Sequence, residues 1–241
     1  MSSLKHNLRK LIWRFGYDIS RFSPLSHPIA KKRRIFNSHN FDVVIDIGAN
    51  VGQFSQHLRE DIGYKKRILS FEPLSSAFTI LKSKARYDSY WDVFNIALGD
   101  VEENKEINIA GNSDSSSLLS MLPYHLKMAP ESKFVGKEMV QIKRLDTIFN
   151  DLCNPSEKIF MKIDTQGYEN RVLIGAENSL KHIDAIQIEM SLVPLYNSEL
   201  LFHQIYIIMN ELGYELISIE PAFLDPKSGQ LLQIDGIFSR I

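Results

Sequence analysis

The sequence has very little cysteine and no long hydrophobic run. Cys153 is the only cysteine among the 241 residues, which excludes an intrachain disulfide and suits a reducing compartment. No apolar run approaches the roughly 18 to 20 residues that span a bilayer. Lys10 and Arg14 interrupt the apolar stretch that a secretory signal would need. We therefore expect a cytoplasmic protein without a transmembrane helix.

Glycine and proline are also few, and no internal repeat or low-complexity segment is present. Collagen-like, fibrous and disordered architectures are therefore excluded. Hydrophobic residues make up 44% of the chain and charged residues 24%, which is typical of a globular protein. A chain of this length buries one large core, whereas two full domains would be cramped. One main domain is expected.

Acidic residues are almost absent from the first forty positions. Residues 1–40 hold nine Lys or Arg and one acid, Asp18, although the whole chain has a net charge of −1. Apolar residues recur there at helical spacing with basic residues between them, which predicts a basic amphipathic helix. The apolar positions are Leu4, Leu8, Leu11, Ile12, Phe15 and Ile19. We expect this helix to pack on the core; contact with an anionic membrane surface or an acidic partner is the alternative.

These patterns divide the chain into a basic N-terminal helical arm, residues 1–40, and a main domain, residues 41–241. In the main domain, short apolar runs alternate with helical patterns, which predicts an α/β fold with a largely parallel sheet covered on both faces. Helices are expected at Leu74–Ala85 and Leu201–Leu212. The predicted strands are Val43–Ile47, Ile68–Phe71, Val93–Leu98, Ile159–Ile163, Ala185–Ile188, Glu215–Ile219 and Leu231–Phe238.

Two regions depart from this alternation. The last two predicted strands are joined by a loop that contains proline and glycine but no helical pattern, so they are expected to pair antiparallel. Residues 99–147 are irregular, with short strands predicted at 106–109 and 139–142 around a serine-rich excursion. Long loops tend to be functional, and this one is expected to close over a substrate.

The first predicted strand ends in the turn Asp-Ile-Gly-Ala-Asn-Val-Gly, residues 46–52. Ligands of open α/β sheets bind where loops leave the carboxyl ends of strands. Gly48 and Gly52 lack Cβ atoms, so backbone N–H groups can approach a ligand there. The nicotinamide pattern G-x-G-x-x-G is not matched, because Asn50 and Gln53 stand at its third and sixth positions. A ligand-binding turn and a purely structural turn both remain open on this pattern.

The second predicted strand ends in Glu72, twenty residues beyond Gly52. An acid at this spacing is expected to bind the ribose of a nucleotide. Two neighbouring strands that both end in residues suited to a nucleotide are much less probable by chance than one such strand. We therefore predict a nucleoside site shared by the two exits.

The segments DIGANVGQF, FEPLSSAF, NIALGD, RLDTIF and MKIDTQGYE occur in this order. Together they resemble the FkbM family of S-adenosylmethionine-dependent methyltransferases over roughly residues 40–240. The resemblance implies a class I methyltransferase, Rossmann-like fold: a seven-stranded mixed sheet with helices on both faces and an antiparallel last strand. It also implies methyl transfer as the activity and S-adenosyl-L-methionine as the cofactor.

The resemblance assigns cofactor contacts to individual positions. The methionine part of the cofactor is expected beside Asp46, Gly48, Asn50 and Gly52. Glu72 is expected to hold the ribose hydroxyls, and Ala97 to lie beside the adenine together with Leu98. Asp164, at the end of the fourth strand, is expected next to the transferred methyl group.

Methyl transfer is an in-line displacement, so the protein must align the acceptor and help to remove its proton. Asp164 and Glu189, at the ends of two strands, are the expected catalytic residues. Glu189 either reaches the cleft or pairs with a base such as Arg171 or Lys162. Gln166 replaces an acid of the family pattern, which disfavours a carboxylate cluster, so no metal is expected. His125 is interpreted as a surface histidine.

These features predict an O-methyltransferase acting on a hydroxyl of a sugar, a glycan precursor or a similar small polar metabolite. The acceptor class rests on the resemblance alone. Tyr124 and Tyr196 are expected either to stack on a sugar face or to belong to the core. One alternative is a non-catalytic regulatory module that binds S-adenosylmethionine or a nucleotide. An RNA methyltransferase is a weaker alternative: because aromatic and basic residues are not interleaved as in a single-strand groove, no nucleic-acid partner is expected.

Overall fold

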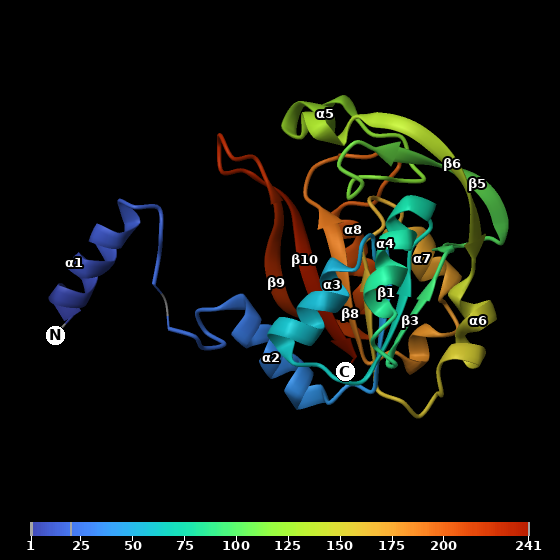
Figure 1. The fold of residues 1–241 in the computed structure, drawn as a ribbon, viewed down its shortest axis with the longest axis horizontal. Helices are drawn as coiled ribbons and strands as arrows, with labels where there is room; N and C mark the ends of the chain where they lie inside the picture. The colour runs from blue at the N-terminus through green and yellow to red at the C-terminus, as the bar shows by residue number, and fades with distance from the viewer. Residues whose placement is uncertain (1, 20, 241) are drawn as a thin grey trace.

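The computed structural model describes residues 2–19 and 21–240. Its central feature is a seven-stranded sheet with the order β3-β2-β1-β7-β8-β10-β9 (Figure 1). The strands are β1 (Val43–Ile47), β2 (Arg67–Phe71), β3 (Trp91–Phe94), β7 (Ile159–Ile163), β8 (Ala185–Ser191), β9 (Tyr214–Leu224) and β10 (Leu231–Arg240). The first five pair in parallel, and β10 is antiparallel to both β8 and β9. The predicted class I methyltransferase sheet, with its last strand inserted antiparallel, is confirmed.

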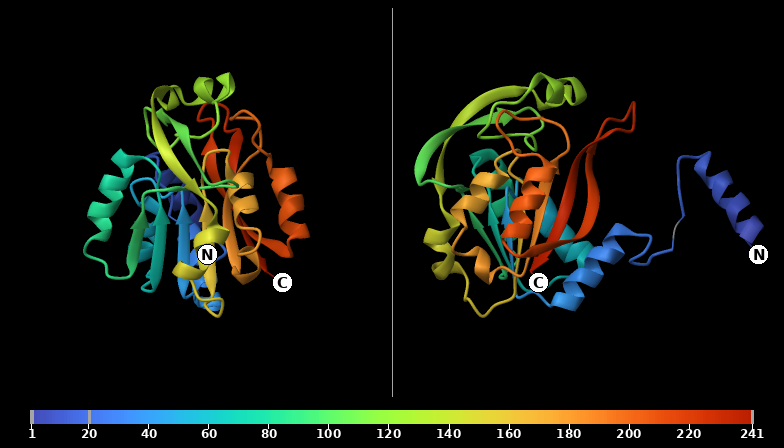
Figure 2. Two further views of the ribbon diagram at one scale, coloured as in Figure 1. Left: turned by 90° about the vertical axis from the view of Figure 1, so that its right-hand side faces the viewer. Right: turned by 180° about the vertical axis from the view of Figure 1, so that it is seen from behind.

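Helices cover both faces of this sheet, as the left panel of Figure 2 shows. One face packs against α2 (Pro28–His39), α3 (Gln53–His57) and α4 (Ser75–Ala85); the other packs against α6 (Leu145–Leu152), α7 (Glu169–Gly175) and α8 (Phe202–Glu211). In β1, Val43 and Ile45 lie in the second of these layers and Val44 in the first. The strand is therefore apolar at nearly every position, as expected for a parallel strand buried on both faces.

A second sheet of three strands extends from one end of the first. It consists of β4 (Ala97–Leu98), β5 (Glu103–Ala110) and β6 (Phe134–Lys143), in the order β4-β6-β5. The prediction of one strand over Val93–Leu98 was wrong. Asn95 Nδ2 donates to the carbonyl oxygens of Glu72 and Pro73, both at 2.9 Å, and beyond it Ala97 and Leu98 pair with β6.

Between β5 and β6 the chain forms the excursion that the sequence indicated. It contains the short helix α5 (Pro123–Met128) and lies over the end of the large sheet where β1 and β2 terminate (Figures 1 and 2). The two flanking strands are longer than the segments predicted at 106–109 and 139–142, and they pair antiparallel. The irregular region is therefore a β-hairpin with a long, folded connection.

The N-terminal helix α1 (Ser2–Trp13) stands apart from the sheet in both figures. The expectation that it packs on the core was wrong: Leu8, Leu11 and Phe15 are exposed. In contrast, α2, which also lies within residues 1–40, packs its buried Phe36 on the core. No helix in the part of the chain that the structure describes is both long and apolar enough to cross a membrane.

Candidate active site

A cavity of about 380 Å³ lies where β1, β2, β7 and β8 end. Its volume is within the range of sites that enclose small molecules and cofactors. Seven of the cofactor-binding and catalytic residues predicted from the sequence line it: Gly48, Asn50, Glu72, Ala97, Leu98, Asp164 and Glu189. The ends of parallel strands meet at one edge of a sheet, and this brings together side chains that are up to 141 positions apart in the sequence.

Gly48 occupies the point where the exits of β1 and β7 come closest. Its φ is +77°, and a Cβ added there would lie 1.8 Å from the carbonyl oxygen of Asp164. The backbone N–H of Gly48 donates to Phe71 O at 3.1 Å, and that of Asp164 donates to Ile47 O at 3.1 Å. A side chain at position 48 would therefore push apart the two strand ends that carry the site.

The structure does not place Gly52 and Asp46 at the cavity. Gly52 precedes α3 with φ +86°, and a Cβ there would meet the side chains of Leu81 and Trp91 at 2.9 and 3.1 Å. Asp46 is fully buried, and it accepts a hydrogen bond from Ser55 Oγ at 2.8 Å. The expected contact of these two residues with the cofactor is therefore replaced by packing for Gly52 and by a buried polar contact for Asp46.

Glu72 is buried at the end of β2, and backbone amides hold both of its carboxyl oxygens. Oε2 accepts from the N–H of Asn50 and Oε1 from that of Leu74, each at 2.8 Å. Burial raises the pKa of Glu72 to about 7 in spite of these two hydrogen bonds, which lower it. The carboxyl group is therefore positioned at the cavity and changes its charge near neutral pH.

The wall beside Glu72 is apolar. It is formed by Phe71, Ile96, Ala97 and Leu98. Two polar residues that flank this wall in the sequence have other partners: Asn95 donates to backbone carbonyl groups, as described above, and Asp100 pairs with Arg171 Nη1 at 2.8 Å. An apolar wall next to a carboxylate suits a flat, weakly polar ring that is joined to a hydroxyl-bearing group.

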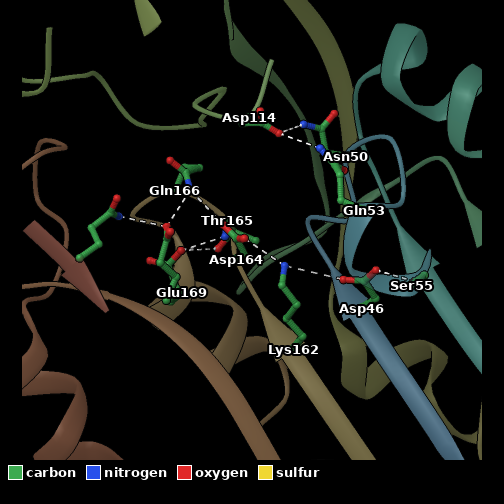
Figure 3. A network of polar contacts seen from close by, with 12 residues as sticks. Asp46, Asn50, Gln53, Ser55, Asp114, Lys162, Asp164, Thr165, Gln166 and Glu169 are labelled. Carbon is green, nitrogen blue, oxygen red and sulfur yellow. Dashed lines mark hydrogen bonds and ion pairs between the residues drawn. The ribbon is translucent and has the colours of Figure 1, made fainter. Parts of the chain in front are cut away.

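The opposite end of the cavity is polar and contains Lys162, a buried lysine at the fourth of the five positions of β7. Its Nζ lies 3.0 Å from Asp164 Oδ2 and 3.8 Å from Asp46 Oδ1 (Figure 3). Burial alone would lower the pKa of Lys162, but Asp164 and Asp46 outweigh it and raise the pKa. Lys162 is therefore a buried cation that connects Asp46 to the cavity. From the sequence, Lys162 is expected only as a partner for Glu189, although a lysine within an apolar strand is itself a signal of a buried ion pair.

Gln166 links the two predicted catalytic acids. Its Nε2 donates to Asp164 Oδ1 at 2.9 Å and to Glu189 Oε2 at 2.7 Å, and its Oε1 accepts from Tyr196 OH at 2.8 Å. Glu189 also accepts from Gln233 Nε2 at 3.0 Å. Burial, followed by the repulsion of nearby acids, raises the pKa of Glu189 well above its ordinary value. Of the two alternatives for Glu189, the one in which it reaches the cleft is observed.

The excursion between β5 and β6 closes one side of the cavity. Asp114 Oδ1 accepts hydrogen bonds from the side-chain amides of Asn50 and, at 3.1 Å, of Gln53 (Figure 3). Ser113 Oγ also accepts from Asn50 Nδ2 at 3.2 Å. Gln53 and Asp114 could not be predicted as site residues from the sequence, because their pairing depends on how a distant loop folds back.

Three other residues discussed from the sequence lie away from the cavity. His125, expected at the surface, is buried with its ring against Tyr196 at a centroid distance of 5.1 Å; that interpretation was wrong. Tyr196 is itself buried, so its ring cannot stack on a ligand. Tyr124 OH donates to Gln230 at 3.4 Å. Within residues 2–19 and 21–240, no three His, Cys, Asp or Glu side chains are grouped so that they could hold a metal ion.

The lining residues fit S-adenosylmethionine. Glu72 presents a buried carboxyl group that can accept hydrogen bonds from ribose hydroxyls, and the adjoining wall of Ala97 and Leu98 matches an adenine ring. Asp164 lies at the polar end of the cavity, where its negative charge could stabilise the positively charged sulfonium. The fold and this cavity define a class I methyltransferase.

Sequence comparison assigns the family. The model of the methyltransferase FkbM domain matches residues 46–216, which is most of the chain. This chain belongs to the FkbM methyltransferase family, and its methyl donor is S-adenosylmethionine. Among curated proteins, a sequence search gives no significant match.

A search of solved structures matches this chain to methyltransferases at low sequence identity. The FkbM methyltransferase from Methylobacillus flagellatus superimposes with a TM-score of 0.50 at 16% identity, over 82% of this chain and 44% of that one. The chain therefore spans less than half the length of that protein. A Burkholderia thailandensis 1,6-didemethyltoxoflavin-N1-methyltransferase, solved with S-adenosylhomocysteine, gives 0.48 at 8% identity over 88% of this chain and 77% of that one. An rRNA methylase from Streptococcus thermophilus gives 0.47 at 8% identity, over 89% and 97%.

Proposed function

We propose that this methyltransferase transfers the methyl group to a hydroxyl oxygen of a sugar, a glycan precursor or a similar small polar metabolite. The observation that carries this proposal is the pair of carboxyl groups, Asp164 and Glu189, at the polar end of the cavity. They share the amide of Gln166, with distances of 2.9 and 2.7 Å to its Nε2. A hydroxyl acceptor needs hydrogen-bond acceptors of this kind, because its proton must leave as the new bond to oxygen forms.

S-adenosylmethionine, when bound, supplies an electrophilic methyl group on a sulfonium. The chain has to orient the acceptor oxygen, exclude water and accept the hydroxyl proton. Asp164 is suited to orientation, because Lys162 and Gln166 each hold one of its carboxyl oxygens. Glu189 is suited to proton uptake, because burial raises its pKa and a carboxylate with a raised pKa is a better base.

The charge of the cavity supports an acceptor that is uncharged at its reacting end. Four acids line the cavity: Glu72, Asp114, Asp164 and Glu189. Lys162 is the one lysine or arginine among the lining residues, and two acids already flank it. A phosphate placed there would meet more negative than positive charge, whereas neutral hydroxyls can donate to the carboxylates. RNA binding would require a groove of positive charge along the backbone.

The proposal is tested by incubating the protein with a methyl-labelled donor and separate pools of neutral oligosaccharides, nucleotide-activated sugars and RNA. We expect label in a carbohydrate pool as an alkali-stable methyl ether, and we expect Asp164→Asn to abolish most of it. Calorimetry with S-adenosylmethionine shows whether the variant still binds the cofactor. Label only in RNA would refute the proposal. Tight cofactor binding without transfer to any pool would favour the non-catalytic regulatory module.

A further inference from the structure

The segment before α2 exposes an unusual amount of large apolar surface. Leu8 is 59% exposed, Leu11 49% and Phe15 73%. Eight of the twenty large apolar side chains that are exposed in the described part of the chain lie within residues 8–25. We call residues 6–19 and 21–25 the exposed arm. Clustered apolar exposure of this kind marks a surface that binds a partner.

Three apolar residues of the exposed arm lie along one side of α1. Leu8 and Leu11 are three positions apart, and Leu8 and Ile12 four, so all three lie on one face of the helix. Arg9 and Lys10 fall between them and project elsewhere. Because the helix stands apart from the sheet (Figure 1), this apolar face has no core to cover, and its partner must come from outside the domain.

The same arm carries basic residues that no acid in the described part of the chain pairs with. Its single acid, Asp18, is paired with Arg9 at 2.5 Å and also accepts from Trp13 Nε1 at 2.9 Å. Lys10, Arg14 and Arg21 have no acidic partner among the described residues. The arm therefore presents an apolar face together with unpaired cations.

We propose that the exposed arm binds the surface of an anionic lipid bilayer. Leu8, Leu11 and Phe15 would enter the boundary between headgroups and acyl chains, while Lys10 and Arg14 contact the lipid phosphates. A nucleic acid offers phosphates but no apolar phase for the helix face. An apolar protein groove would leave the cations without partners. A bilayer with anionic lipids satisfies both features, and the proposal does not depend on which acceptor is methylated.

The test is vesicle flotation of the full chain with phosphatidylcholine vesicles and with vesicles that also contain phosphatidylglycerol. We expect binding to the anionic vesicles and at least about tenfold weaker binding to the neutral ones. The triple variant Leu8→Ser, Leu11→Ser, Phe15→Ser should lose binding. As a matched control, Ile80→Ser, Tyr87→Ser, Val135→Ser removes three exposed apolar side chains elsewhere and should bind like the original chain.

A charge variant, Lys10→Glu with Arg14→Glu, separates the two components. It should reduce binding to anionic vesicles at least about tenfold and leave the thermal unfolding temperature unchanged, because the arm is apart from the core. The proposal would be overturned if the original chain bound neutral and anionic vesicles equally well, or if it bound neither. Two further results would also overturn it. In the first, the chain does not bind vesicles but binds single-stranded RNA, and the apolar triple variant still binds the RNA. In the second, the chain forms dimers through the exposed arm and does not bind vesicles.

Discussion

The carboxylate of Glu72 accepts a hydrogen bond from the backbone N–H of Asn50 at 2.8 Å. This contact joins the exits of β1 and β2, and the second carboxyl oxygen is held by Leu74 N at the same distance. The acid that we expect to bind the ribose is thus positioned by backbone groups. Such preorganisation reduces the free energy that binding would spend on ordering the site.

Replacing Glu72 with Gln should weaken binding of S-adenosylmethionine about tenfold or more, because a charge-assisted hydrogen bond to the ribose is lost. The amide also introduces a donor where Asn50 and Leu74 already donate. Titration calorimetry measures the change. Glu106→Gln, at an exposed salt bridge with Lys137, should leave the affinity unaltered. Equal affinities of Glu72→Gln and the original chain would refute the ribose assignment.

Glu72 should also make stability depend on pH. Burial raises its pKa from 4.5 to about 7 in the folded chain, so between these values the folded state binds more protons than the unfolded state. The contribution of Glu72 to the free energy of unfolding therefore falls as the pH rises across this window. Urea unfolding at about pH 5 and about pH 8 should show a smaller fall for Glu72→Gln than for the original chain. Identical falls would contradict the raised pKa.

Gly48→Ala should be much more destabilising than Gly63→Ala. Both glycines have positive φ, +77° and +81°, but an added Cβ at 63 meets nothing within 4 Å, whereas at 48 it meets Asp164 O at 1.8 Å. Strain alone costs about 1 to 2 kcal/mol, which is the loss expected at 63. The loss at 48 should exceed it by at least about 2 kcal/mol. Denaturant unfolding of both variants measures the difference, and similar losses would argue against the close approach of β1 and β7.

Asp164→Asn should lower turnover more than cofactor binding. The asparagine side chain has nearly the same shape, but it no longer carries the charge that pairs with Lys162 at 3.0 Å. We expect kcat to fall by about a hundredfold, the scale of the loss when an acceptor is no longer held in the reactive orientation, with a smaller change in the Kd for S-adenosylmethionine. Asp92→Asn, at an exposed position of β3, is the control. A loss confined to binding would instead assign Asp164 to the cofactor alone.

Gln166→Glu should destabilise the protein at neutral pH and much less in acid. The substitution removes the amide that Asp164 and Glu189 share, at 2.9 and 2.7 Å, and places a third carboxyl group there. Repulsion disfavours the charged forms, so the free energy of unfolding should drop by about 1 to 3 kcal/mol near neutrality. Gln230→Glu, at an exposed position, serves as the control. Thermal unfolding across the pH range measures both variants, and pH-independent loss would exclude charge repulsion.

The sheet could be predicted because buried parallel strands need apolar residues at nearly every position, as in Val43–Ile47 and Ile159–Ile163. The antiparallel pairing of β9 and β10 could be predicted because the loop that joins them has no helical pattern. The break at Asn95 could not be predicted, because the apolar residues on both sides of it continue the pattern. It depends on hydrogen bonds from Asn95 to the carbonyl groups of Glu72 and Pro73.

By itself, the sequence determined which acids meet at the edge of the sheet. Glu72 and Asp164 directly follow strands, Glu189 lies near the end of β8, and parallel strands bring their ends to the same edge. Only the tertiary structure decided that Asp46 lies beneath the cavity behind Lys162, and that Gly52 packs on Trp91. The reason is physical: the positions of buried strands follow from local apolar patterns, whereas the environment of a side chain depends on segments that are distant in the sequence and meet only in the folded chain.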